Sequence, residues 1–239
     1  MDDNETFKLP RLYSDHQLSE QGVIELSAGQ AHYLHNVLRR QNGDLVRLFD
    51  GKNGEWLGSL GNLSKKTGQV TLQKQLVAQP TKKRAIHLLF APIKKHRQDW
   101  LIEKAVELGV TDFHPVLTQN TEVRKLNDSR LTQQIFEAAE QCERFDIPQL
   151  HDLKKLDKIL SSRSAALPLF ACIERFDTKP LQEVVPNNSQ NVALLIGPEG
   201  GFTEMEKNII AKHATAVGLG DTILRCETAV IKALVLLNA

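Results

Sequence analysis

The sequence predicts an α/β protein in which a small β-rich domain precedes a larger domain of alternating strands and helices. The first 76 residues contain short apolar strand patterns separated by turn residues, with a single helical pattern among them. From about Arg84 onwards, apolar strands alternate with amphipathic helices, which is typical of a parallel sheet covered on both faces. The linker "AQPTKK" separates the two patterns. We therefore predict domains over residues 1–76 and 77–239.

Three strands and one helix are expected in the first domain. Residues 44–50 ("DLVRLFD") and 55–60 ("EWLGSL") flank the turn "GKNG" and predict a hairpin. Residues 69–76 ("QVTLQKQL") alternate apolar and polar side chains and predict a half-buried strand. A helix is expected over residues 28–40, because it has an apolar face and an Asn-Gly pair follows it. That face comprises Ala31, Leu34, Val37 and Leu38.

The second domain is expected to alternate strands with helices along its whole length. Asp99 is a candidate N-cap for the first of these helices, and Gly109 is its candidate C-terminal cap. Thr203 and Glu206 have the spacing of a capping box. The predicted strands are 85–92, 110–117, 166–173, 191–196 and 214–220, and the predicted helices are 100–109, 130–145 (opened by Asp128 or Ser129), 179–185, one from 203, and 227–239.

Composition excludes several classes of protein. The 239 residues carry a net charge of +1, and 41% of them are hydrophobic, as in an ordinary globular protein. The three cysteines are far apart with no C-x-x-C spacing, so disulfides and structural zinc are not expected. The acidic N-terminus "MDDNETFKLP" lacks the apolar region of a signal peptide, and no apolar run is long enough to cross a membrane. A cytoplasmic location is therefore expected.

Basic residues gather in local clusters although the chain is nearly neutral. Residues 79–98 contain six lysines and arginines and no Asp or Glu, and the pairs Arg39-Arg40 and Lys65-Lys66 lie upstream. Such a run is often no more than a solvated face. Several clusters in one chain also fit a stripe that binds phosphates.

Two glycine-containing loops follow predicted strands and are candidates for a ligand site. The segment "GPEGG" (197–201) follows "NVALLI", and "GLGDTILRCETA" (218–229) follows the last strand. Neither has the G-x-G-x-x-G pattern or the Gly-Lys-Ser/Thr of a P-loop. Ligands of parallel sheets bind at the carboxyl ends of the strands, and glycines let a ligand approach the backbone closely. Apolar side chains beside free backbone groups suit an adenosine-like ligand better than a triphosphate.

Three segments resemble the signatures of a known class of enzymes. "LLIGPEGGF", "LGDTILRCETA" and "EKAVELGV" are similar to segments of the SPOUT class of RNA methyltransferases. "RLYSD", "HYLHNVLRRQNGD", "LFDGKNGEW" and "EQCERFDIP" extend the resemblance to the bacterial RsmE family over nearly the whole chain. The family implies a PUA-like β-barrel domain and a SPOUT domain with a C-terminal trefoil knot. It also implies S-adenosylmethionine as cofactor, a homodimer, and methylation of uracil N3 in 16S ribosomal RNA of the small subunit.

The resemblance assigns residues to the cofactor site, and the chemistry of the implied reaction makes two residues candidates for catalysis. Arg225 is expected to orient the base or to stabilise negative charge on the uracil oxygens. Glu227 is expected to accept a proton or to hold Arg225, unless it serves only as a helix cap. The segment 119–121 (Gln-Asn-Thr) replaces the Glu-Arg and small residue that the family usually has. The implied cofactor residues are Leu195, Ile196, Gly197, Glu199, Gly200, Leu219, Gly220, Ile223, Leu224 and Arg225.

RNA binding is expected to fall to basic side chains, and no metal is expected to take part. The histidines show no convincing ligand spacing.

Two other functions stay open: methylation of a different RNA, and a non-catalytic RNA-binding assembly factor. A nucleotide-dependent oxidoreductase is disfavoured, because the dinucleotide fingerprint is missing. The predicted RNA contacts are Arg11, Arg39, Arg40, Lys94 and Arg97, and the histidines considered are His32, His35, His87, His96 and His114.

Overall fold

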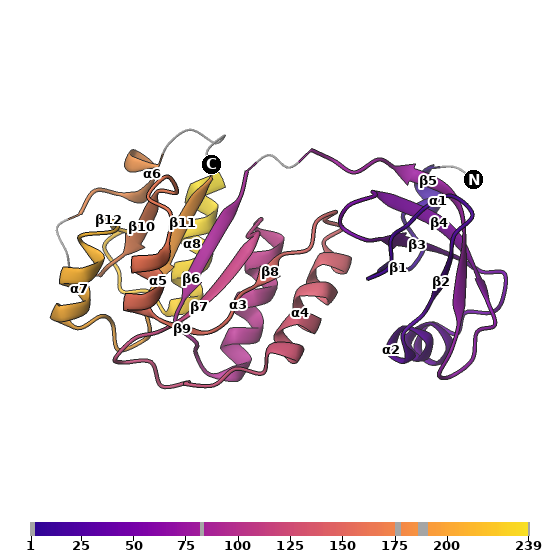
Figure 1. Ribbon diagram of the computed structural model, residues 1–239, viewed down its shortest axis with the longest axis horizontal. Helices are drawn as coiled ribbons and strands as arrows, with labels where there is room; N and C mark the ends of the chain where they lie inside the picture. Colours follow the sequence, from indigo (N-terminus) through magenta and orange to yellow (C-terminus); the bar gives the residue numbers. More distant parts are fainter. Residues whose placement is uncertain (1–2, 82–83, 175–177, 186–190, 239) are drawn as a thin grey trace. The chain divides into compact units, whose positions relative to one another are not determined.

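The computed structural model describes residues 3–81, 84–174, 178–185 and 191–238 (Figure 1). It divides into two compact units, one of Met1–Thr81 with Ala139–Ile147 and one of Lys82–Ala138 with Pro148–Ala239. The predicted boundary lies a few residues before the observed one. The prediction was wrong for Ala139–Ile147, which was expected in the second domain but belongs to the first unit. Tertiary hydrogen bonds hold it there: the guanidinium of Arg11 donates to the carbonyl oxygens of Ala139 and Arg144.

The first unit contains one five-stranded sheet with the strand order β1-β3-β4-β5-β2. The predicted hairpin is confirmed, since β3 and β4 pair antiparallel. β1 and β2 form the edges of the ladder, so the described strands make a half-barrel and not a closed barrel. Eleven buried side chains, from Leu12 to Leu72, form its core. The elements are α1 (Asp3–Thr6), β1 (Arg11–Tyr13), β2 (Val23–Glu25), α2 (Ala28–His32), η1 (Tyr33–Val37), β3 (Leu45–Phe49), β4 (Glu55–Gly61) and β5 (Gln69–Val77).

The predicted helix over residues 28–40 changes type after its first turn. Helix α2 has a capping box between Ser27 and Gln30, and it continues as the π-helical segment η1. The wider π turn rotates the following residues relative to an α-helix. Leu34 is therefore fully buried, whereas Val37, which was predicted to share its face, is 59% exposed.

The second unit is an all-parallel sheet with helices on both faces (Figure 1). The strand order is β12-β10-β11-β6-β7-β8, and β9 pairs with β7. Helix α8 packs against α3 and β11, while α5 packs against α7 and β7. The elements are β6 (Ile86–Phe90), α3 (Lys95–Glu107), β7 (Asp112–Leu117), α4 (Asp128–Gln141), β8 (Gln149–Leu150), β9 (Lys154–Lys155), α5 (Leu156–Ser162), β10 (Leu169–Cys172), α6 (Leu181–Val184), β11 (Val192–Ile196), α7 (Glu204–Ile210), β12 (Thr215–Val217) and α8 (Cys226–Asn238).

Most of the predicted helix caps in the second unit are confirmed, and one is wrong. The capping box between Thr203 and Glu206 opens α7, and Gly109 follows α3 with φ +93. Asp99 is not an N-cap, because α3 already begins at Lys95. Its carboxylate lies within the helix and accepts a hydrogen bond from Arg130 at 2.6 Å. Across the described ranges, no helix is long and apolar enough to cross a lipid bilayer.

Candidate active site

A cavity of about 620 Å³ lies at the carboxyl ends of β10, β11 and β12. The two glycine-containing loops form much of its wall, so it stands where the sequence predicted a ligand. Eight of the ten predicted cofactor residues line it. They are Ile196, Gly197, Glu199, Gly200, Leu219, Gly220, Ile223 and Leu224.

The other two predicted cofactor residues do not line the cavity. Leu195 is fully buried within the apolar cluster on the face of the sheet that α5 covers, because neighbouring residues of β11 point to opposite faces. Arg225 precedes α8, and its carbonyl oxygen accepts the first helical hydrogen bond from Ala229 at 2.8 Å. Its side chain is exposed.

The loop 197–201 is held in place by its own residues and by the 119–121 segment. Gly197 leaves room for the ring of Phe202, since a Cβ at Gly197 would lie only 2.8 Å from that ring. The side-chain amide of Asn120 donates to the carbonyl oxygens of Gly200 and Gly201 at 2.9 and 3.0 Å. The backbone N–H of Gln119 donates to Glu206 at 2.8 Å. The segment that departs from the family pattern therefore supports the cavity wall.

Arg97 pairs with a residue of the cavity wall and does not lie on an open basic face. Its guanidinium pairs with the carboxylate of Glu199 at 3.0 Å, and the Arg97 side chain is only 21% exposed. The ion pair ties the first turns of α3 to the glycine loop. This paired and largely covered guanidinium differs from the exposed phosphate contact that the sequence predicted.

The first two residues of α8, Cys226 and Glu227, are buried although each carries a polar, ionisable side chain. The thiol of Cys226 donates to the carbonyl oxygen of Gly197 at 3.1 Å. Burial, with smaller contributions from the carboxylates of Glu199 and Glu227, raises the pKa of Cys226 to about 12. Glu227 is 6% exposed, and its Oε2 has no hydrogen-bond partner among the described residues. A buried carboxylate oxygen without a partner is costly. Glu227 itself is not among the residues that line the cavity.

Sequence reasoning missed several residues of the cavity wall. Glu174, Thr178 and Lys207 line it but come from segments that carry no motif. Asp221 also lines it and lies inside the second loop. Glu174 directly follows the predicted strand 166–173, so the strand-end rule could have found it, whereas only the fold brings Thr178 and Lys207 to the cavity.

The prediction that Arg11 contacts RNA is not supported by its surroundings. Arg11 is 8% exposed, and its guanidinium pairs with buried Glu55 at 2.5 Å. Its ring neighbour is Phe49, whose centroid lies 3.6 Å from the guanidinium carbon. Together with the two carbonyl contacts to 139–147, these interactions occupy the side chain. Arg11 holds the first unit together.

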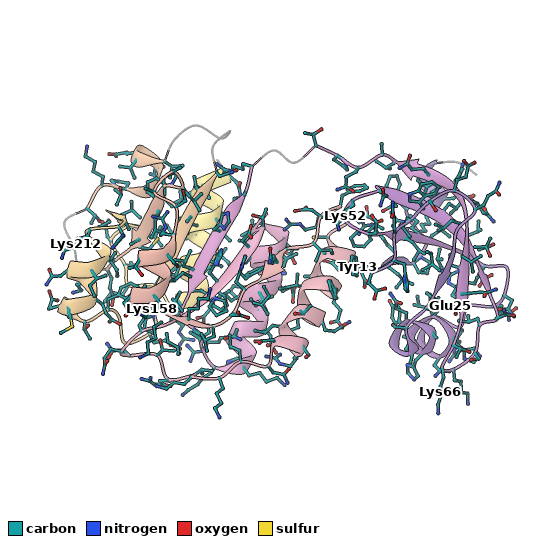
Figure 2. The ribbon with its side chains drawn as sticks, viewed as in Figure 1. Tyr13, Glu25, Lys52, Lys66, Lys158 and Lys212 are labelled. Atoms are coloured by element: carbon teal, nitrogen blue, oxygen red, sulfur yellow. The ribbon has the colours of Figure 1, made fainter. Side chains whose placement is uncertain are left out.

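The remaining basic residues divide between the two units. In the first unit Arg39 is exposed with φ +53, and Arg40 is half-buried. The loop after β4 lies beside them, because the N–H of Leu63 donates to Asn42 at 2.8 Å. Figure 2 shows Lys66 of this loop pointing outward near α2. In the second unit the Lys94 side chain is 64% exposed, 3.8 Å from Glu122. Lys82 and Lys83 lie outside the described residues.

Three histidines and one aspartate meet in the second unit, although their spacing in the sequence gave no sign of it. His87 Nδ1 lies 3.0 Å from His114 Nε2, and His151 Nε2 lies 2.9 Å from Asp112 Oδ1. Burial, with the neighbouring imidazoles, lowers the pKa of His114 to about 3. Parallel pairing of β6 with β7 and of β7 with β8 assembles the group.

Known protein families and individual proteins match this chain along most of its length. Residues 80–238 match a family described as an RNA methyltransferase domain, and residues 26–73 match an RNA methyltransferase PUA domain. A ribosomal RNA small subunit methyltransferase E from Rickettsia conorii is 32% identical over 95% of this chain and 94% of its own length. The chain belongs to the ribosomal RNA small subunit methyltransferase E family.

Solved structures of similar proteins agree over the whole methyltransferase E fold. A protein from Legionella pneumophila, described as a methyltransferase in complex with bound S-adenosylmethionine, is 30% identical with a TM-score of 0.87, and the match covers 97% of each chain. A ribosomal RNA small subunit methyltransferase E from Neisseria gonorrhoeae, bound to S-adenosylmethionine, is 28% identical with a TM-score of 0.84 and 95% coverage of both chains.

Proposed function

We propose that this protein transfers a methyl group from S-adenosylmethionine to N3 of a uridine in 16S ribosomal RNA of the small subunit. The observation that carries the proposal is the cavity of about 620 Å³, walled by both signature loops at the carboxyl ends of the parallel strands. Membership of the methyltransferase E family supports the reaction class. Action on the small subunit is consistent with the cytoplasmic location expected from the sequence.

The cavity fits the proposed cofactor in size and chemistry. Pockets of about 300–1,000 Å³ hold ligands of this size. Ile196, Leu219 and Leu224 offer apolar surface to an adenine ring. The carboxylates of Glu174 and Asp221 can accept hydrogen bonds from ribose hydroxyls or from an ammonium group. When bound, S-adenosylmethionine supplies a sulfonium methyl group that is ready for transfer.

Glu227 and Arg225 are the residues we propose for the chemistry on uracil. N3 of uracil carries a proton that must leave for the nitrogen to attack. The unpartnered Oε2 of Glu227 is a suitable acceptor for that proton. The exposed guanidinium of Arg225 precedes Glu227 by two residues and can donate to a uracil oxygen that gains negative charge. Because N3 is hidden in base-paired RNA, the enzyme requires an unpaired or extruded base.

RNA positioning is proposed for the basic residues that remain exposed. Arg39, with Lys65 and Lys66 on the adjoining loop, forms a basic group on the first unit. Lys94 provides a separate exposed cation on the second unit. Such contacts orient RNA without reading its sequence. Arg40 is retained as a secondary contact, since it is half-buried.

A homodimer and a C-terminal knot are further parts of the proposal. Trp100 of α3 and Val235 of α8 are 44% and 49% exposed, and these two helices pack together. Exposed apolar side chains on adjoining helices suit a subunit interface. Strand β12 lies at the edge of the sheet, and the chain that follows it turns back towards β11. There the thiol of Cys226 contacts the carbonyl oxygen of Gly197, the residue after β11. We propose that the knot forms at this return, a rare departure from ordinary chain topology.

The proposal is tested by methyl transfer to small ribosomal subunits that lack the modification. Labelled S-adenosylmethionine is supplied, and the digested RNA is analysed for 3-methyluridine. The expected product is one 3-methyluridine per subunit, and primer extension locates it because N3-methylation blocks pairing. Methylation of another nucleoside or another RNA would favour the alternative target. Absence of S-adenosylmethionine binding by calorimetry would favour a non-catalytic RNA-binding factor.

A further inference from the structure

The histidine cluster of the second unit brings metal-ligating atoms from separate strands into one place. His87 lies on β6 and both Asp112 and His114 lie on β7, and each residue offers a ligand atom within 4.8 Å of those of the others. His87 pairs directly with Asp112 in the sheet register. Parallel pairing holds the backbones of all three residues in fixed positions.

The distances within the cluster approach those of a coordination shell. The facing nitrogens of His87 and His114 lie 3.0 Å apart, and the other nitrogen of His87 lies 3.7 Å from Asp112 Oδ2. Two donors of a tetrahedral zinc ion with bonds of 2.0–2.1 Å are about 3.3 Å apart. Because these two distances involve different nitrogens of His87, its ring must turn so that a single nitrogen joins His114 and Asp112 around one ion. One ligand atom from each residue already lies within 4.8 Å of the others.

We propose that His87, Asp112 and His114 form a binding site for a divalent transition metal ion of the zinc type. Two imidazole nitrogens and one carboxylate oxygen suit such an ion, whereas Mg²⁺ and Ca²⁺ prefer oxygen ligands throughout. The side chains of His87 and Asp112 are 22% and 16% exposed, which leaves a route for the ion and for a water as fourth ligand.

His151 supports this site from the next strand outward. Its ring stacks on that of His114 with centroids 4.0 Å apart and an interplanar angle of 10°. Its Nε2 lies 2.9 Å from Asp112 Oδ1, and the hydroxyl of Thr111 donates to Asp112 Oδ2 at 2.7 Å. Outer contacts of this kind orient ligands and increase metal affinity. His151 is therefore a positioning residue in the proposal.

The site is separate from the methyltransferase cavity. His87 and Asp112 stand near the beginnings of β6 and β7, whereas the cavity is lined by residues at the carboxyl ends of β10, β11 and β12. A bound ion would link neighbouring strands of the sheet. We infer a stabilising role for the metal, with no part in methyl transfer.

Zinc titration of the full chain tests the proposal directly. The protein is treated with EDTA, dialysed, and titrated with zinc chloride by calorimetry. Cobalt chloride is titrated in parallel, because the visible spectrum of Co²⁺ reports its coordination geometry. We expect one ion per chain, and an increase in Tm of about 5 °C at saturating zinc. His114→Gln and Asp112→Asn are each expected to weaken zinc binding at least tenfold.

His96→Gln is the matched control, since His96 is exposed on α3 outside the cluster. It is expected to leave zinc affinity unchanged. If a cluster variant fails to fold by circular dichroism, His87→Asn replaces it. Equal zinc affinity in the wild type and all cluster variants would overturn the proposal, as would no binding to the folded wild type. S-adenosylmethionine affinity, measured on the same samples, is expected to stay unchanged, which separates this site from the proposed methyltransferase function.

Discussion

The guanidinium of Arg97 lies 3.0 Å from the carboxylate of Glu199, which joins the first turns of α3 to the glycine loop at the cavity. This contact changes the role expected for Arg97. An exposed arginine would attract phosphate, but this one is largely covered and already paired. It fixes a cavity-lining residue before any ligand arrives, and such preorganisation favours binding.

Arg97→Ala is expected to weaken S-adenosylmethionine binding more than RNA binding. Loss of roughly 1 kcal/mol of loop stabilisation corresponds to about a fivefold rise in Kd. Calorimetry with S-adenosylmethionine measures it, and Glu199→Gln tests the same contact from the other side. The double variant should weaken binding by less than the sum of the two single effects. A purely additive double variant would show that the ion pair does not support the loop.

Glu227→Gln is expected to reduce methyl transfer by about a hundredfold or more, with S-adenosylmethionine affinity kept within about twofold. The amide has the same shape but cannot take up the N3 proton. Glu137→Gln on α4 is the control, because that side chain is exposed and does not line the cavity. Full activity in the Glu227→Gln variant would show that Glu227 serves only as a helix cap.

Arg11→Met is expected to lower the free energy of unfolding by about 3 kcal/mol, because it leaves buried Glu55 with only one cation. Arg47, at 3.1 Å from Glu55, is that remaining cation. Urea unfolding measures the change. Lys52→Met, at an exposed position of the same unit, should have little effect. Loss of RNA affinity with unchanged stability would instead restore Arg11 as an RNA contact.

The Cys226 thiol is expected to resist alkylation in the folded protein. The pKa of about 12, against an ordinary 9.0, keeps the thiol protonated, so at pH 8 the thiolate is about a thousandfold rarer. Raising the pH towards 12 should speed the reaction as long as the fold persists. Mass spectrometry after iodoacetamide treatment measures modification at this site, and the urea-unfolded chain serves as the control. Equal rates in the two states would contradict the buried, protonated thiol.

Replacing Arg39 and Lys66 together with glutamine is expected to weaken binding of a ribosomal RNA fragment. Each lost phosphate contact should reduce the slope of log K against log salt concentration by about 0.7 to 0.9. Fluorescence anisotropy at several salt concentrations provides that slope. Lys158→Gln is the control, since Figure 2 shows Lys158 on the other unit and it is exposed. An unchanged slope would remove this basic group from the RNA surface.

The sequence by itself determined the features that arise from neighbouring residues. Apolar periodicity predicted the parallel strands and the alternating helices, because each pattern reflects which faces of an element are buried. The capping box at Thr203 and the glycine after α3 were readable because a helix end is satisfied by residues within one turn. The two glycine-containing loops located the cavity because ligands of parallel sheets bind at the segments that follow the strands.

Only the tertiary structure decided the features that depend on residues far apart in the chain. From the sequence Arg11 is expected to be a free cation, but the fold places Glu55 and the 139–147 segment around it. The π turn at Tyr33–Val37 exposes a side chain that helical spacing would bury. His87, Asp112 and His114 meet only because β6 and β7 pair in register. Burial and charge pairing are properties of the packed interior, so local patterns could predict the elements but not these partners.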